Sequence, residues 1–134
     1  MRSDGKKGLK DCRILIVEDD FYQATELLGQ LRSAGVQAVL VTGCVHEAFS
    51  CVESRLADLA LLDIHLGAEN CFDLARALQR RGIPFLFLTG YGKEVLPEDL
   101  SGAPFLTKPS DGPTVVAALK EIRHRADDRP TALT

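Results

Sequence analysis

A few polar side chains suited to phosphoryl chemistry each follow directly after a short apolar run of this chain. Carboxylate oxygens are the ligands that Mg²⁺ prefers, and an aspartate beside that ion can attack phosphorus. A hydroxyl and an ammonium can bind the phosphoryl oxygens. We therefore predict a magnesium and phosphoryl site. Its candidate residues are Glu18 and Asp19 after the run 14–17, Asp63 after 59–62, Thr89 after 85–88, and Lys108 after 105–107.

The apolar runs themselves are typical of strands buried in a parallel sheet. They are short, almost continuously apolar, and separated by segments with helical spacing. In an open parallel sheet, ligands bind beyond the carboxyl ends of the strands. The candidate residues lie far apart along the chain, yet this topology would gather them around one point.

Each candidate also has a simpler structural explanation. The acidic run 18–20 can cap the N-terminus of a helix, and taken alone this alternative has as much support as a metal site. Asp63 and the pair 89–90 can be turn residues, and the pair 108–109 can be a loop after an edge strand. The functional interpretation depends on finding all of them at the ends of four strands.

The alternation of strand and helix patterns predicts an α/β fold with three layers. Helical spacing of the kind seen at Ala24, Leu27 and Leu31 recurs between the apolar runs. Right-handed crossovers favour a five-stranded parallel sheet of order 2-1-3-4-5 with five helices, the flavodoxin-like arrangement. Pro97 interrupts the fourth helix, which should be short or irregular. The strands are expected at about 12–18, 37–42, 58–63, 84–88 and 104–107.

Composition and charge predict one cytoplasmic domain. Within the 134 residues, we expect a flexible leader over 1–11, the domain over 12–125 and a polar tail over 126–134. The net charge of −3 gives no drive toward nucleic acid or membrane, and no segment has the pattern of a transmembrane helix or signal peptide. The cysteines lack metal or redox spacing and are expected to be reduced thiols. They are Cys12, Cys44, Cys51 and Cys71.

With these motifs in place, the chain resembles the response-regulator receiver domains, the CheY-like phosphoacceptor modules of two-component signalling. The resemblance covers about 12–125, and its matching stretches are 14–20, 61–64, 88–90 and 106–109. The stretch 84–92 is similar to a subgroup of stand-alone, single-domain receivers from alphaproteobacteria that carry a Phe-Ala-Thr-Gly-Tyr-like motif. The loop after Asp63 lacks the proline and the Asp-Gly pair that are common in the family.

The resemblance implies a role for each candidate residue. Asp63 would accept a phosphoryl group from a histidine kinase or phosphotransfer protein. Asp19 and Asp63 would ligate Mg²⁺ directly, together with the backbone carbonyl of His65, and Glu18 would act through water. Thr89 and Lys108 would bind the phosphoryl oxygens. The residues that would change conformation on activation are Thr89, Phe105 and Tyr91.

The interpretation is a regulatory phosphoacceptor that signals by protein contact or as a phosphate sink, and not a turnover enzyme. We expect no output domain after the last predicted helix, and therefore expect a downstream protein partner or a phosphorylation-dependent dimer to read the signal. Two alternatives stay open. One is a Mg²⁺-dependent phosphohydrolase with an aspartyl-phosphate intermediate, and the other is a receiver that is never phosphorylated.

Overall fold

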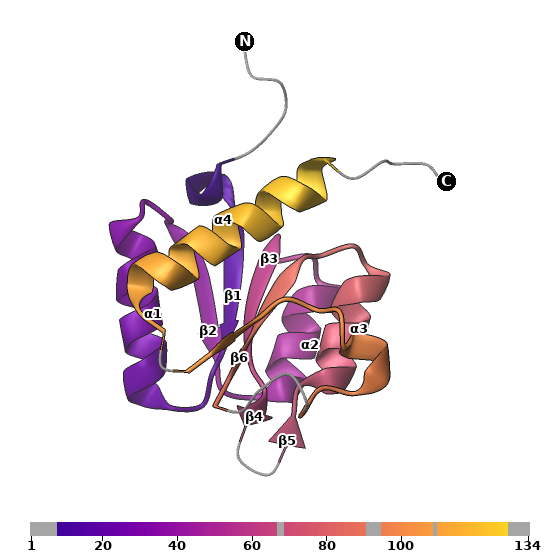
Figure 1. Cartoon of the computed structure of the whole chain (residues 1–134). Coiled ribbons are helices and arrows are strands. Elements are labelled where there is room, and N and C mark those ends of the chain that lie inside the picture. The colour runs from indigo at the N-terminus through magenta and orange to yellow at the C-terminus, as the bar shows by residue number, and fades with distance from the viewer. Residues whose placement is uncertain (1–7, 67–68, 91–94, 109, 129–134) are drawn as a thin grey trace.

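A five-stranded parallel sheet forms the centre of the computed structural model, which describes residues 8–66, 69–90, 95–108 and 110–128. The strand order β2-β1-β3-β6-β7 confirms the predicted order 2-1-3-4-5 (Figure 1). Each strand falls within one residue of its predicted range. The strands are β1 (Arg13–Val17), β2 (Ala38–Thr42), β3 (Leu59–Asp63), β6 (Phe85–Thr89) and β7 (Phe105–Thr107).

Helices cover both faces of the sheet and complete the predicted three-layer sandwich. One face packs against α1 (Phe21–Ser33) and α4 (Gly112–Asp128), whose buried side chains share a cluster with alternate residues of β1, β3 and β6. The opposite face packs against α2 (Val45–Glu53) and α3 (Phe72–Arg80). Because successive strand residues point to opposite faces, strands that are buried on both sides read as continuous apolar runs.

The prediction of five helices is wrong by one, since the described residues hold four α-helices. Of the segment 92–101, the described part 95–101 contains only the 3-10 helix Glu98–Leu100. Pro97 precedes this turn, and proline supplies no backbone N–H to a helix and disfavours helical geometry at the residue before it. Leu96 and Leu100 are still buried against the core, so the segment packs without being helical.

Ordered structure begins earlier and ends later than the predicted domain boundaries. Leu9–Asp11 form a 3-10 helix inside the stretch predicted as a flexible leader, and Leu9 is buried with Leu31 and Leu119 among others. At the other end, α4 continues to Asp128, three residues beyond the predicted limit of 125. Both stretches are polar in composition, so neither the buried Leu9 nor the last turn of α4 was expected from the sequence.

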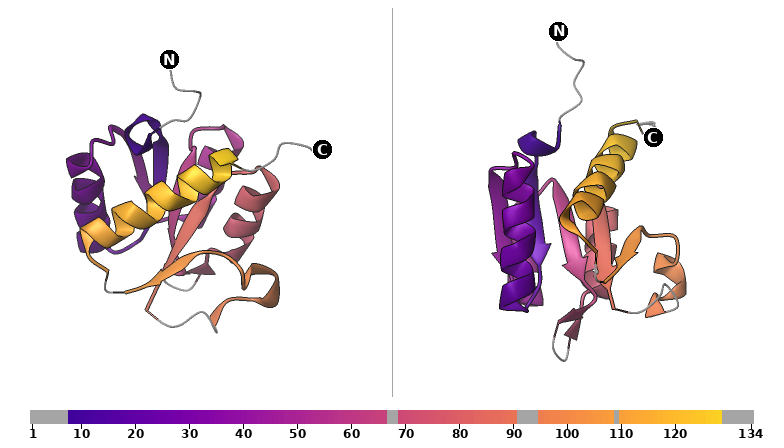
Figure 2. Two further views of the ribbon diagram at one scale, coloured as in Figure 1. Left: turned by 45° about the horizontal axis from the view of Figure 1, so that its top comes forward. Right: turned by 60° about the vertical axis from the view of Figure 1, so that its left-hand side comes forward.

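A short antiparallel hairpin follows β3 and was not predicted. It pairs β4 (His65–Leu66) with β5 (Glu69–Asn70). The hairpin projects from the end of the sheet that lies away from the chain termini (Figure 2). It therefore stands beside the carboxyl ends of the strands, where the candidate residues are expected.

Among the described helices, none has the length and apolar character to cross a membrane.

Candidate functional site

Three acidic side chains meet at the carboxyl ends of β1 and β3. One carboxylate oxygen from each of Glu18, Asp19 and Asp63 lies within 4.8 Å of one from each of the others. Glu18 and Asp63 are buried, with exposed fractions of 3% and 8%, whereas Asp19 is exposed. The cluster is thus closed on the protein side and open to solvent at Asp19.

Strand register brings these acids together. β1 and β3 are adjacent and parallel, with Val17 opposite Leu62, so Glu18 and Asp63 are the next residues on the two strands. The backbone N–H of Glu18 donates to the carbonyl of Thr42 at 2.9 Å, which continues the pairing of β1 with β2 by one residue. The positions of Glu18 and Asp63 therefore follow from sheet pairing, and Asp19 is the next residue along the chain.

Asp20 has a different role from its two acidic neighbours. Its side chain accepts a hydrogen bond from the backbone N–H of Gln23 at 3.0 Å and caps the N-terminus of α1. Its own N–H donates to Glu18 Oε2 at 3.1 Å. The helix-cap alternative for the run 18–20 is correct for Asp20, and the other two acids belong to the cluster.

Lys108 places a positive charge against the buried acids. Its Nζ lies 3.3 Å from Glu18 Oε1 and 3.3 Å from Asp63 Oδ2. Its backbone N–H donates to the carbonyl of Thr89 at 2.7 Å, which ties the ends of β6 and β7 together. Thr89 is the last residue of β6 and is almost fully buried. All five candidate residues thus stand at the same edge of the sheet.

Burial, together with the neighbouring Asp63, raises the pKa of Glu18 to about 7. Burial is the largest cause, and a hydrogen bond with Asp63 is the next. The N–H of Asp20 and the charge of Lys108 act in the opposite direction and do not offset these two effects. Glu18 therefore stands beside a second buried carboxylate, and the positive charge at the site does not restore its usual pKa.

The donor set fits Mg²⁺. Hard carboxylate oxygens from three side chains converge within 4.8 Å, and the exposed side of Asp19 leaves room for the waters that this ion retains. A divalent cation would also relieve the repulsion that raises the Glu18 pKa. The residues that would hold the ion are Glu18, Asp19 and Asp63, on the ends of two paired strands.

The remaining predicted site residues fall into three situations. His65 is the first residue of β4, two positions after Asp63, so its backbone lies next to the site. The role of its carbonyl as a metal ligand stays a prediction. Phe105 begins β7 opposite Phe87 and is half-buried against the cluster that includes Phe87. Tyr91 lies outside the described residues, so its predicted role in activation stays a prediction.

Two residues next to the site were not singled out from the sequence. Gly43 follows β2, and a Cβ added there would lie 3.0 Å from Asp19 Cα, closer than side-chain atoms normally approach. Cys71 is the residue directly before α3 and is fully buried. Burial raises the pKa of the Cys71 thiol to about 12, with a further contribution from the charge of Asp63. The signal available for Gly43 was a glycine directly after the second strand. Cys71 was noted in the sequence only as a reduced thiol, and nothing there placed it near the acids.

None of the four cysteines, all of which lie in the described part of the chain, forms a disulfide bond. Cys12 and Cys71 are buried, Cys51 is half-buried and Cys44 is exposed.

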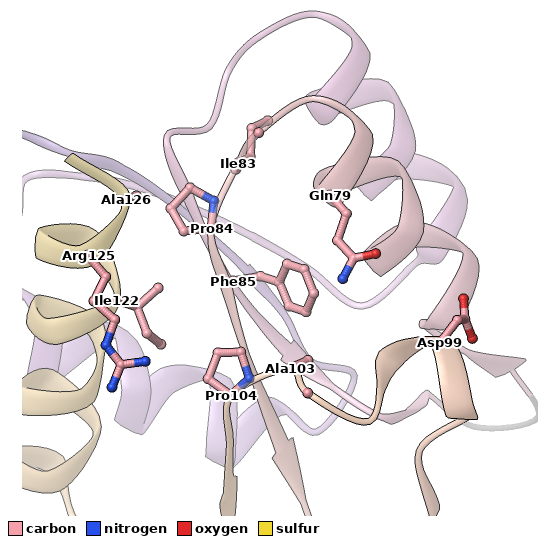
Figure 3. Close-up of a pocket in the computed structure, with 12 residues that line it drawn as sticks. Gln79, Ile83, Pro84, Phe85, Asp99, Ala103, Pro104, Ile122, Arg125 and Ala126 are labelled. Atoms are coloured by element: carbon pink, nitrogen blue, oxygen red, sulfur yellow. The ribbon is translucent and has the colours of Figure 1, made fainter. Parts of the chain in front are cut away.

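A separate cavity of about 600 Å³ lies at the opposite end of the sheet (Figure 3). It is formed where β6 and β7 begin, between α3, the 3-10 helix Glu98–Leu100 and α4. Phe85 and Ile122 contribute apolar surface, while Gln79, Asp99 and Arg125 add polar groups. The cavity lies where β6 and β7 begin, whereas the acidic cluster lies where β1 and β3 end, and the two share no residue.

Comparison with known proteins agrees with this arrangement. The family model described as the response regulator receiver domain matches residues 14–120. The sensory transduction protein LytT of Bacillus subtilis is 30% identical over 115 residues, which are 83% of this chain and 48% of LytT. RegX3 of Mycobacterium tuberculosis is 29% identical over 119 residues, which are 86% of this chain and 52% of RegX3. The chain thus spans about half the length of these curated relatives.

Solved structures give the same result for the fold. A CheY-like response regulator receiver domain protein from Methanospirillum hungatei has a TM-score of 0.76 and 26% sequence identity, and the match covers 87% of this chain and 96% of that one. The subgroup with the Phe-Ala-Thr-Gly-Tyr-like motif stays a prediction.

Replacing Gly43 with alanine should destabilise the protein by about 1–3 kcal/mol, because the new Cβ would press on the backbone of Asp19. Gly29→Ala is the matched control, since the same atom added within α1 meets nothing within 4 Å. That control should stabilise the protein by about 0.5–1 kcal/mol through helix propensity. The measurement is the free energy of unfolding in urea. Equal effects of the two substitutions would show that Gly43 is not sterically required.

Replacing Glu18 with glutamine should remove a pH dependence of stability. A carboxyl whose pKa is higher in the folded than in the unfolded state stabilises the fold at low pH, and that contribution is lost as the pH rises through about 7. The unfolding free energy of Glu18→Gln minus that of the parent protein should therefore rise by on the order of 1–3 kcal/mol from pH 5 to pH 8. Urea unfolding at both pH values, without divalent cations, measures this difference. A difference that stays constant with pH would contradict the assignment.

Proposed function

Because this chain belongs to the family of response regulator receiver domains, we propose that it is a phosphoacceptor of a two-component system, with Asp63 as the residue that is phosphorylated. The donor is a histidine kinase or a phosphotransfer protein, and the reaction requires Mg²⁺. The observation that carries the proposal is the position of Asp63, buried between the acids of β1 and the ammonium of Lys108.

The proposed transfer uses Asp63 as a nucleophile. A carboxylate oxygen of Asp63 attacks the phosphorus of a phosphohistidine, the P–N bond breaks and the imidazole leaves with that electron pair. The product is an acyl phosphate on Asp63. When bound, Mg²⁺ supplies charge neutralisation for the phosphoryl oxygens.

The other residues of this site have positioning and electrostatic roles in the proposal. Lys108 Nζ already lies 3.3 Å from Asp63 Oδ2 and would bind one phosphoryl oxygen after transfer. The Thr89 hydroxyl would donate to another. Glu18 and Asp19 would hold the cation with Asp63, and the His65 carbonyl would complete the protein ligands. Because most of the catalytic work in phosphoryl transfer is positioning and charge neutralisation, this set is sufficient.

We further propose that phosphorylation changes the face formed by the segment 95–101, β7 and α4. Inward movement of Thr89 toward the phosphoryl group would pull on Lys108, whose N–H is bonded to the Thr89 carbonyl, and so on β7. Phe105 at the start of β7 would then repack. The cavity in Figure 3 gives this face a recess, lined by both apolar and polar side chains, for a downstream protein partner.

We propose that the protein acts in the cytoplasm, where such kinases present their phosphohistidine.

The alternatives receive less support. A phosphohydrolase of the haloacid-dehalogenase type uses a second aspartate two residues after the nucleophile, and this chain has His65 there. A receiver that is never phosphorylated would have no need for an intact acidic set beside a lysine. In the proposed role each chain accepts one phosphoryl group on Asp63 and does not turn over a substrate. The role is therefore regulatory and not enzymatic.

Incubation with Mg²⁺ and acetyl phosphate should add the mass of one phosphoryl group to the intact protein. The addition should need Mg²⁺ and should be abolished in Asp63→Asn, because an ordinary surface aspartate lacks the neutralising groups of this site. Asp73→Asn is the matched control, since its side chain is 85% exposed on α3 and pairs with Arg76 away from the cluster. Intact-mass spectrometry is the measurement.

Two results would contradict the proposal. One is equal phosphorylation of Asp63→Asn and the parent protein. The other is release of many equivalents of inorganic phosphate per chain from a small phosphate ester, which would favour the phosphohydrolase.

A further inference from the structure

We propose that β2 is a self-association edge, and that it pairs antiparallel with β2 of a second copy of this chain. The pairing would join two five-stranded sheets across a two-fold axis. It would need neither phosphorylation nor Mg²⁺, so it goes beyond the proposed function and stands or falls separately from it.

The edge of the sheet at β2 is apolar and carries no charge. β2 is the terminal strand, paired with β1 on one side only (Figure 1). The ten residues 36–45 contain no Asp, Glu, Lys, Arg or His, in a chain that is 26% charged. Leu40 and Val41 are 40% and 43% exposed and, as neighbours in a strand, point to opposite faces of the sheet. Both faces of the edge are therefore partly open and apolar.

The backbone of β2 offers hydrogen-bonding groups at this edge. The carbonyl of Thr42 accepts from Glu18 N–H, so Thr42 directs its backbone groups toward β1. Residues that alternate with it along the strand do the same, which includes Leu40. Val39 and Val41 lie between them and direct their N–H and C=O groups away from β1, to the side where the sheet order ends.

These groups are complementary to themselves under a two-fold rotation. With the axis at Leu40, Val39 stands opposite Val41 of the second copy, and Val41 stands opposite its Val39. In an antiparallel ladder, residues so placed exchange both N–H···O=C bonds. Leu40 then faces Leu40 of the second copy in a non-hydrogen-bonded pair, where side chains approach most closely. Within residues 36–45, no position in this register brings two like charges together.

Comparison with the other edge of the sheet supports this choice. β7 is only three residues long, is preceded by Pro104 and is followed directly by Lys108. Short length, proline and lysine are the usual means by which proteins prevent edge-to-edge pairing. β2 is five residues long and has none of these features. An uncharged, self-complementary edge fits a second copy better than a charged partner strand.

The proposed interface between the two β2 strands is small, so we expect its affinity to be low. One pair of five-residue strands with the flanking side chains falls in the size class of weak, transient interfaces. The dimer should therefore depend on concentration, with a closed two-fold form and no larger assembly.

Sedimentation equilibrium of the full chain, from low micromolar to millimolar concentration, tests the proposal. The weight-average mass should rise from one chain to two. Leu40→Lys and Leu40→Glu should each remain monomeric, because each sets two like charges opposite one another at the axis. An equimolar mixture of the two variants should regain the mass of a dimer, since opposite charges then face each other.

The matched control is Leu56→Lys, which changes an equally exposed leucine outside β2 and should leave the association unchanged. Far-ultraviolet circular dichroism would verify that every variant is folded. Amide hydrogen exchange gives a second readout, since the Val39 and Val41 amides should become more protected as the concentration rises. A parent protein that is monomeric at millimolar concentration would overturn the proposal. So would a mixture of the two Leu40 variants that stays monomeric, or a Leu56→Lys variant that loses the dimer.

Discussion

Repulsion between carboxylates at the end of a parallel sheet is the constraint on which the rest of the site depends. β1 and β3 are neighbours in register, so Glu18 and Asp63 are forced together as soon as the sheet forms. Burial of both side chains makes the repulsion stronger than it would be in water. The pKa of Glu18 is raised chiefly by that burial, and Asp63 adds to the shift. The ammonium of Lys108 compensates only in part, which leaves an electrostatic preference for a divalent cation.

The core of the fold could be predicted from the sequence because its strands are buried on both faces. Such strands are continuous apolar runs, and a parallel sheet with right-handed crossovers admits few arrangements of five of them. The same logic located the acids, since the residue after each run must stand at the carboxyl edge. Asp20 could not be separated from Glu18 and Asp19 in this way, because a helix cap and a metal ligand both call for a carboxylate after a strand.

The parts that escaped prediction are those governed by tertiary packing or by loop geometry. The 3-10 helix that begins at Leu9 is kept in place by one buried leucine in a polar stretch. The hairpin β4–β5 has strands of two residues, too short to show an alternating pattern. Gly43 is required by its distance to Asp19, which is distant in sequence. For the segment after β6, Pro97 correctly indicated irregularity, but the packing of Leu96 and Leu100 could not be derived from it.

A crystal structure of the protein with Mg²⁺ and beryllofluoride, a stable mimic of the phosphoryl group, tests the central claim most directly. The account predicts a metal ion in contact with the carboxylates of Asp19 and Asp63. It also predicts the beryllium on Asp63 and the Lys108 ammonium against one of its fluorides. A metal ion bound away from these acids, or beryllofluoride attached to another residue, would contradict the account.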